Sequence, residues 1–153
     1  DDLLELYCGS GTFSLPMRNL FNKIFATESN RQSIRCLKKS INEQNIKNIF
    51  HARLSAEEVS ELFNGRIFTR MKGVNISDFN FSHVLVDPPR AGLDEDVIRL
   101  INKFENIIYV SCNYETYSRD IKNLSSYKIK NIEFFDQFPN TKHLEIVSLL
   151  SKK

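Results

Sequence analysis

The sequence predicts an α/β fold with a mostly parallel, doubly wound sheet, and three observations support this prediction. Short apolar segments alternate with segments of helical period along most of the 153 residues. The last two apolar segments have no helical segment between them. The most unusual motifs come directly after apolar segments, at the edge where a parallel sheet binds its ligands.

Each element is predicted from its local pattern. Strands are expected at residues 3–7, 23–27, 46–52, 83–86, 107–110, 128–135 and 144–150. Helices are expected at residues 14–21, 32–44, 55–63, 94–104 and 115–124. Ser55 with Glu58 fits a capping box, and Asp94 is the expected N-cap of the fourth helix.

Two segments complete the predicted fold. Residues 64–81 lack a regular period and hold Arg66, Arg70 and Lys72, so we expect a surface insertion that is solvated or contacts a substrate. The last two strands are expected to pair antiparallel at one side of the sheet. The result is a mostly parallel seven-stranded sheet with an antiparallel edge strand.

Composition indicates one soluble domain, with 41% hydrophobic and 26% charged residues. No apolar run reaches the roughly 18 residues that a membrane-spanning helix needs. A net charge of +2 does not by itself indicate a nucleic-acid partner. The three cysteines, Cys8, Cys36 and Cys112, form no CxxC pair, which argues against a disulfide framework or a metal site and suits the cytoplasm.

A glycine-rich loop follows the first predicted strand. Gly9 and Gly11 lie where backbone must approach a ligand closely, and Glu28 follows Gly11 by 17 residues, at the end of the next strand. An acidic residue at that place can hold a ribose. Ser14 stands where a dinucleotide motif has its third glycine, which favours S-adenosylmethionine over a dinucleotide. The alternative is an ordinary turn with a surface glutamate.

Two further motifs follow the fourth and fifth strands. Asp87 is followed by two prolines, which stiffen the chain and hold its carboxylate at the sheet edge, and then by Arg90. Cys112 precedes a predicted helix, whose N-terminus lowers the pKa of a thiol. The alternative for the first motif is a rigid end of the strand with a solvated Arg90. The alternative for the second is that Cys112 is only a small core residue.

The last motif contains His143 and Glu145, two residues apart at the start of an apolar strand. Apolar surroundings raise the pKa of a carboxylate, which suits a general base near neutral pH. The alternative for Glu145 is a strand-edge glutamate in water.

Together these segments resemble the RNA uracil-5 methyltransferase family, and so imply a Rossmann-like class I S-adenosylmethionine-dependent methyltransferase fold. The matching strings are LYCGSGTFSL at 6–15, ATE at 26–28, VDPPRAGL at 86–93, SCN at 111–113, and DQFP with HLE between 136 and 145. They follow the family's order along nearly the whole chain. Residues 56–58, 67–73 and 136–139 look most like the bacterial tRNA enzymes that make ribothymidine in the T-loop.

The resemblance implies a chemistry and a set of site residues. Cys112 matches the nucleophile that adds to C6 of uracil, and Glu145 matches the base that removes the C5 proton. The positions that match cofactor contacts are Tyr7, Gly9, Gly11, Thr12, Glu28 and Asp87. Substrate contacts are expected from Asp87, Arg90, Asn113 and His143. The expected partner is the T-arm of tRNA, bound by a monomer without a metal ion.

The chain departs from the family at Tyr114, where proline is common, and we expect only a local change at the start of that helix. Residues 1–153 are expected to be the catalytic domain of a longer protein, whose RNA-binding part precedes them. Without that part, we expect weak cofactor and RNA binding. Two other functions remain open at this point: the same methylation of ribosomal RNA, and a non-catalytic module that binds or folds RNA. An amino-group methyltransferase is disfavoured by Arg90.

Overall fold

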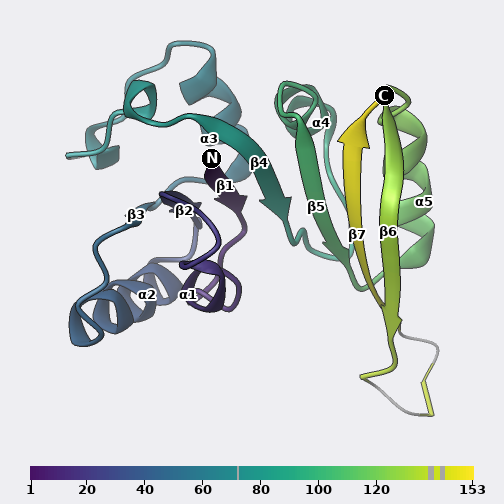
Figure 1. The fold of residues 1–153 in the computed structure, drawn as a ribbon, viewed down its shortest axis with the longest axis horizontal. Coiled ribbons are helices and arrows are strands. Elements are labelled where there is room, and N and C mark those ends of the chain that lie inside the picture. Colours follow the sequence, from purple (N-terminus) through teal and green to yellow (C-terminus); the bar gives the residue numbers. More distant parts are fainter. Residues whose placement is uncertain (72, 138–139, 142–143) are drawn as a thin grey trace.

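The computed structural model describes residues 1–71, 73–137, 140–141 and 144–153, which form a seven-stranded sheet with helices on both faces (Figure 1). The strands are β1 (Asp2–Leu6), β2 (Ile24–Thr27), β3 (Ile49–Ala52), β4 (Phe81–Val86), β5 (Asn106–Ser111), β6 (Tyr127–Phe135) and β7 (Glu145–Lys152). The helices are α1 (Ser14–Met17), α2 (Arg31–Glu43), α3 (Ala56–Phe63), α4 (Glu95–Ile101) and α5 (Tyr114–Asn123), with 3₁₀ turns at Thr69–Met71 and Ile76–Asp78. All seven strands and all five helices were expected from the sequence.

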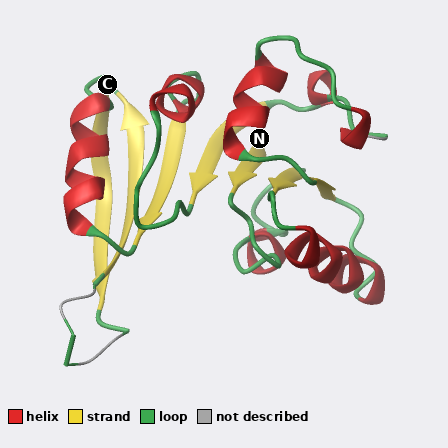
Figure 2. Cartoon of the chain, turned by 180° about the vertical axis from the view of Figure 1, so that it is seen from behind, coloured by secondary structure: helices red, strands yellow, loops and turns green. Residues whose placement is uncertain are grey.

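The strand order is β3-β2-β1-β4-β5-β7-β6, and β1 to β5 all pair in parallel. β1 therefore lies in the middle of the sheet. β2 and β3 extend the sheet on one side of β1, and β4 pairs with its other side. Residues of α1 and α2 pack on one face of the sheet and residues of α3, α4 and α5 on the other, so the loops after β1 and β4 lead to opposite faces. Figure 2 shows the sheet and its helices from behind. This arrangement opens the crevice in which doubly wound sheets bind ligands.

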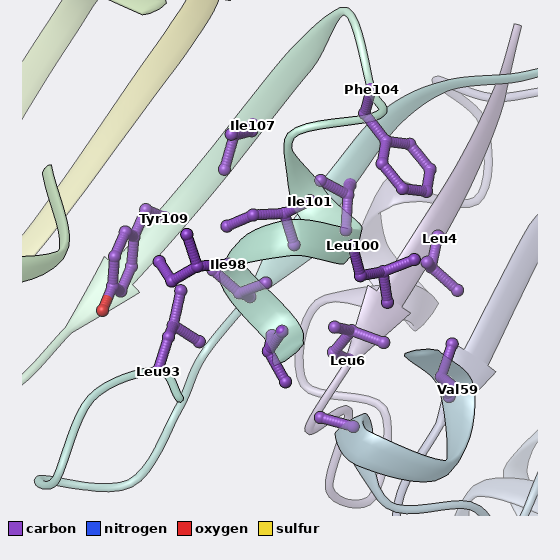
Figure 3. Close-up of a cluster of buried hydrophobic side chains, with 14 of the residues drawn as sticks. Leu4, Leu6, Val59, Leu93, Ile98, Leu100, Ile101, Phe104, Ile107 and Tyr109 are labelled. Carbon is purple, nitrogen blue, oxygen red and sulfur yellow. The ribbon is translucent and has the colours of Figure 1, made fainter. Parts of the chain in front are cut away.

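The sheet is buried because successive residues of its central strands face different helical layers. Leu4 and Leu6 of β1 belong to the cluster that includes α3, α4 and α5, whereas Leu3 packs with α2 on the other face. Figure 3 shows part of the larger layer, in which Leu100 and Ile101 of α4 are completely or almost completely buried. Burying one such side chain stabilises the fold by about 1.5–3 kcal/mol.

The structure corrects one predicted detail and adds the order of the last two strands. The first helix ends at Met17 instead of residue 21, since the Arg18 guanidinium donates to the Leu15 carbonyl (2.6 Å) and Leu20 N–H closes a tight turn on Met17. The last two strands pair antiparallel at one side of the sheet, as expected: β7 lies between β5 and β6 and is antiparallel to both, and β6 forms the edge. The more apolar β7 takes the inner place, while eight of the nine β6 residues are exposed.

The insertion between α3 and β4 is less solvated than the sequence suggested. Phe68 is buried and packs against the larger core cluster. The Arg66 and Arg70 guanidinium groups lie over its ring, with centroid distances of 4.9 and 5.6 Å. Both arginines also pair with glutamates of α3, Glu61 and Glu58. Their charges are therefore compensated within the fold, and Lys72 lies outside the described residues.

No helix in the described part of the chain is long and apolar enough to cross a membrane.

An ionisable side chain, Glu5, is completely buried in the middle of β1. Its Oε2 atom accepts a hydrogen bond from the Ser14 hydroxyl, and its Oε1 atom has no hydrogen-bond partner in the described part of the chain. Burial raises the pKa of Glu5 to about 8; the Ser14 hydrogen bond opposes this shift, and the charge of Asp87 adds to it. At neutral pH the buried carboxyl is therefore mostly protonated.

This raised pKa predicts a pH dependence of stability. Between pH 4.5 and about 8 the folded state binds more protons at Glu5 than the unfolded state, so the free energy of unfolding falls as pH rises through that window. We expect Glu5→Gln to reduce the loss of stability between pH 5 and pH 8, as measured by urea denaturation. Glu133→Gln, on the exposed strand β6, is the matched control. An unchanged pH dependence in Glu5→Gln would contradict this assignment.

Candidate active site

The loop after β1 joins the end of β2 through a hydrogen bond. Gly9 and Gly11 both have positive φ, at 55° and 97°. The Gly9 N–H donates to Glu28 Oε2 (3.1 Å), and Glu28 Oε1 accepts from the Asn30 N–H (2.7 Å) and the Ser29 hydroxyl (3.2 Å). The structure thus brings together the loop and the acidic residue that the sequence indicated.

Gly11 is required by both its conformation and its packing. A Cβ atom at this position would lie 2.6 Å from Leu37 Cδ1 and 3.1 Å from Leu15 Cγ. The absence of a side chain lets α2 press against the loop and leaves the loop backbone at the sheet edge. Thr12, the next residue, is exposed in the turn that leads to α1.

A pocket of about 210 Å³ lies at the carboxyl ends of β1, β2 and β3. Its lining includes Tyr7, which has a φ of 59°, together with Glu28 and Pro89. Burial raises the pKa of Tyr7, and nearby carboxylates add to this effect, so its hydroxyl stays protonated. Sequence reasoning missed one wall, formed by residues 54–57 after β3, although the rule that ligands bind beyond strand ends points to them.

Asp87 and Glu145 approach each other although they are 58 residues apart in the chain. Asp87 follows β4 and is half-buried, and Glu145 is the first residue of β7. Burial raises the pKa of Asp87 to about 6, and the charge of Glu145 adds to the shift. Asp87, a carboxyl group with a raised pKa, therefore lies near the Glu145 charge at the ligand edge of the sheet.

Cys112 lies one residue beyond β5, half-buried. The Ser111 hydroxyl donates to the Asn113 carbonyl (3.0 Å) and accepts from the Asn113 N–H (3.2 Å), which clamps the backbone around the thiol. The antiparallel register pairs Ser111 with Ile146, so the next step along both strands leads to Cys112 and Glu145. The expected nucleophile and the expected base thus occupy facing ends of neighbouring strands.

Asn113 connects this loop to the segment after β4. Its side chain caps α5 by accepting from the Glu115 N–H (3.0 Å), and its Nδ2 donates to the Arg90 carbonyl (3.1 Å). The Thr116 hydroxyl donates to the same carbonyl (3.2 Å). Tyr114, which stands where proline is common in the family, is the first residue of α5. Arg90 is exposed, and the predicted site residue His143 lies outside the described residues.

The other candidates for a place in this site are the two remaining cysteines, a metal ion and Glu5. Cys8 is buried beneath the glycine loop, and burial raises the pKa of its thiol, whereas Cys36 is exposed on α2. Among the described residues, no three His, Cys, Asp or Glu side chains gather as a metal site. Glu5 was missed by sequence reasoning, although an acidic residue within an apolar strand is a visible signal.

Comparison with known proteins agrees with this geometry. A family model described as tRNA (Uracil-5-)-methyltransferase matches residues 1–153. The tRNA/tmRNA (uracil-C(5))-methyltransferase of Campylobacter lari is 54% identical over 146 residues, which cover 94% of this chain and 42% of that protein. The protein of the same name from Saccharophagus degradans is 47% identical over 99% of this chain and 42% of its own length. The chain therefore spans less than half the length of these curated relatives.

Solved structures give the same result. The structure of Pyrococcus abyssi tRNA (uracil-54, C5)-methyltransferase in complex with S-adenosyl-L-homocysteine has a TM-score of 0.76 and 30% identity, covering 97% of this chain and 33% of that one. An rRNA methylase from Streptococcus thermophilus has a TM-score of 0.70 at 9% identity, which shows the fold alone. The fold is that of the class I S-adenosylmethionine-dependent methyltransferases, and the chain belongs to the tRNA (uracil-5-)-methyltransferase family.

Proposed function

We propose that this chain is the catalytic domain of a protein that transfers a methyl group from S-adenosylmethionine to C5 of a uridine in the T-loop of tRNA. The observation that carries the proposal is the placement of Cys112 and Glu145 at facing strand ends, next to Asp87. A thiol and a carboxylate in this arrangement suit covalent catalysis at a pyrimidine. The relatives, a tRNA/tmRNA (uracil-C(5))-methyltransferase and a tRNA (uracil-54, C5)-methyltransferase, support the choice of RNA and the position in it.

The residues around the glycine loop fit the cofactor. S-Adenosylmethionine supplies an electrophilic methyl group on a sulfonium centre. Glu28 has a carboxylate anchored by two backbone N–H groups, which preorganises it to accept hydrogen bonds from a ribose. Tyr7 lines the same pocket as Glu28, and Gly9, Gly11 and Thr12 belong to the loop that donates to it. In the strand order, Asp87 after β4 lies between Glu28 after β2 and Cys112 after β5.

The chemistry of this chain's residues follows from their types. The Cys112 thiolate adds to C6 of uracil, and the electron pair of the C5–C6 double bond moves to C5 and O4 as an enolate. Bound S-adenosylmethionine would supply the methyl carbon to C5, with its bond to the sulfonium sulfur breaking and S-adenosylhomocysteine leaving. The Glu145 carboxylate removes the C5 proton, the double bond forms again, and the thiolate leaves. Each of these steps balances without an oxidant or a metal ion.

The RNA must present the uracil outside its stack, because the thiol lies within the sheet edge. Arg90 remains a proposed contact to a phosphate or a carbonyl, and Asn113 orders the loop that carries the nucleophile. His143 remains a proposed substrate contact. Two of the basic residues near the insertion, Arg66 and Arg70, form ion pairs with α3, so most phosphate contacts are expected from the rest of the longer protein.

The central prediction concerns a covalent intermediate. With S-adenosylmethionine and a T-arm RNA carrying 5-fluorouridine, the full-length protein should gain the mass of the RNA, since fluorine blocks proton removal from C5. Peptide mapping should place the adduct on Cys112, and Cys112→Ala should form none. Cys36→Ala, at an exposed cysteine, is the matched control. No adduct despite cofactor binding would argue for ribosomal RNA, which the same assay tests, or for a binding module.

Glu145→Gln should still allow Cys112 to add to C6 of uracil but should block the later release of the thiolate. Without a base for the C5 proton, we expect methylated ordinary uridine to stay attached to Cys112, and turnover to fall by roughly 10²–10⁴-fold. Denaturing gels would show the trapped complex, and a tritium-release assay from C5-labelled RNA would show the missing proton transfer. Glu133→Gln, on β6, should retain full turnover. Normal tritium release in Glu145→Gln would assign the base to another group.

Glu28→Gln should weaken cofactor binding without affecting the fold. A hydrogen bond to a charged group contributes about 1.5–3 kcal/mol, so the dissociation constant should rise by roughly 10- to 100-fold. Isothermal titration calorimetry on the full-length protein measures the change. Glu43→Gln, at the exposed end of α2, should bind as the unmodified protein does. Equal affinity in Glu28→Gln would place the ribose elsewhere.

A further inference from the structure

Asp120 of α5 has a buried carboxylate to which neither the cofactor site nor the substrate site assigns a role. Its side chain is completely buried. It accepts hydrogen bonds from the Leu93 N–H (2.8 Å), the Tyr109 hydroxyl (2.6 Å) and the Arg119 Nε–H (2.8 Å). One carboxylate thus joins the segment after β4, the strand that leads to Cys112, and the helix that follows it.

The backbone after β4 is held by α5 along several consecutive residues. Arg119 donates from Nη2 to the carbonyls of Ala91 (3.0 Å) and Leu93 (3.1 Å). The carbonyl of Arg90 accepts two hydrogen bonds from the first turn of the same helix. The segment that begins with Asp87 is therefore tied to α5 by hydrogen bonds.

Gly92 shows how closely the two segments approach. It has a φ of 76°, and a Cβ atom built on it would lie 2.6 Å from both Asp120 Oδ2 and Arg119 Nη2. Only glycine allows the backbone to adopt this conformation and to lie against the ion pair.

Tyr109 supplies the link to the nucleophile. It lies on β5 three residues before Cys112, and Figure 3 shows its ring and hydroxyl in the core beside Leu93. Burial raises the pKa of Tyr109, and the hydrogen bond to Asp120 adds to the shift, so the hydroxyl donates over the whole working range of pH. A buried network that is fully satisfied holds its members rigidly in one arrangement.

We propose that Asp120 is a positioning residue that sets the place of residues 87–93, and with them Asp87 and Arg90, relative to Cys112. It acts through Tyr109, Arg119 and the amide of Leu93, and touches neither cofactor nor RNA. The inference rests on the proposed function, because it concerns the alignment of a uracil site with its nucleophile. A shift of about 1 Å in such an alignment can cost about 100-fold in rate.

The test compares two tyrosines in the full-length protein. Tyr109→Phe removes one oxygen and keeps the ring, which packs against Tyr117 with centroids 5.3 Å apart. The matched control is Tyr127→Phe, which removes a buried hydroxyl that donates to the Ile101 and Phe104 carbonyls. Tyr127 begins β6, at the end of the strand away from Glu145. Each variant thus loses one buried hydroxyl with its hydrogen bonding, but only one of them borders the proposed network.

We expect Tyr109→Phe to slow adduct formation on 5-fluorouridine T-arm RNA at least fivefold at saturating RNA and cofactor, with cofactor affinity unchanged within twofold. Tyr127→Phe should lower the melting temperature without slowing the adduct. Asp120→Asn should slow it further than Tyr109→Phe if it folds, and amide exchange of residues 90–93 should accelerate in both network variants.

The outcomes separate the inference from the proposed function. Equal adduct rates in Tyr109→Phe and Tyr127→Phe, or a slowing that only follows the loss of melting temperature, would overturn the positioning role alone. Absence of any adduct in the unmodified protein would overturn the proposed function and this inference with it.

Discussion

The parallel pairing of β1 with β2 on one side and β4 on the other is the constraint on which the site depends. Because β2 and β4 lie on opposite sides of β1, the loops after β1 and β4 leave toward opposite faces. Their divergence leaves backbone N–H groups and side chains exposed at the carboxyl edge, with no helix between them. The glycine loop, Glu28 and the Asp87 segment take their positions from this reversal of strand order.

The buried and half-buried acidic side chains of this region have two opposite environments. Glu5 and Asp87 are buried or half-buried without an ion-pair partner among the described residues, so their raised pKa values lower the stability of the fold near neutral pH. Asp120 instead receives hydrogen bonds from three donors and an ion pair with Arg119. Glu5 and Asp87 can therefore bind and release protons, whereas Asp120 holds β5, α5 and the segment after β4 rigidly together.

Much of this could be predicted from the sequence because the signals are local. Strand ends, the glycine loop and the two prolines after Asp87 place the candidate residues at one edge without knowledge of any contact. The place of β7 inside the sheet could not be predicted this way, since local patterns do not state which strand of a hairpin joins β5. The link of Tyr109 to Asp120 was missed for the same reason: it joins a strand to a helix across the core.

The segment after β4 belongs to both halves of the site. Pro89 lines the pocket beside Glu28, whereas the carbonyl of the next residue, Arg90, is bound by α5. Any displacement of this segment therefore changes both the pocket beside Glu28 and the contacts with the loop that carries Cys112. Two prolines limit its own freedom, and α5 limits its freedom relative to the sheet. Under the proposed function, alignment between the methyl donor and Cys112 thus depends on how these five residues, 87–91, are held, more than on any single contact in the pocket.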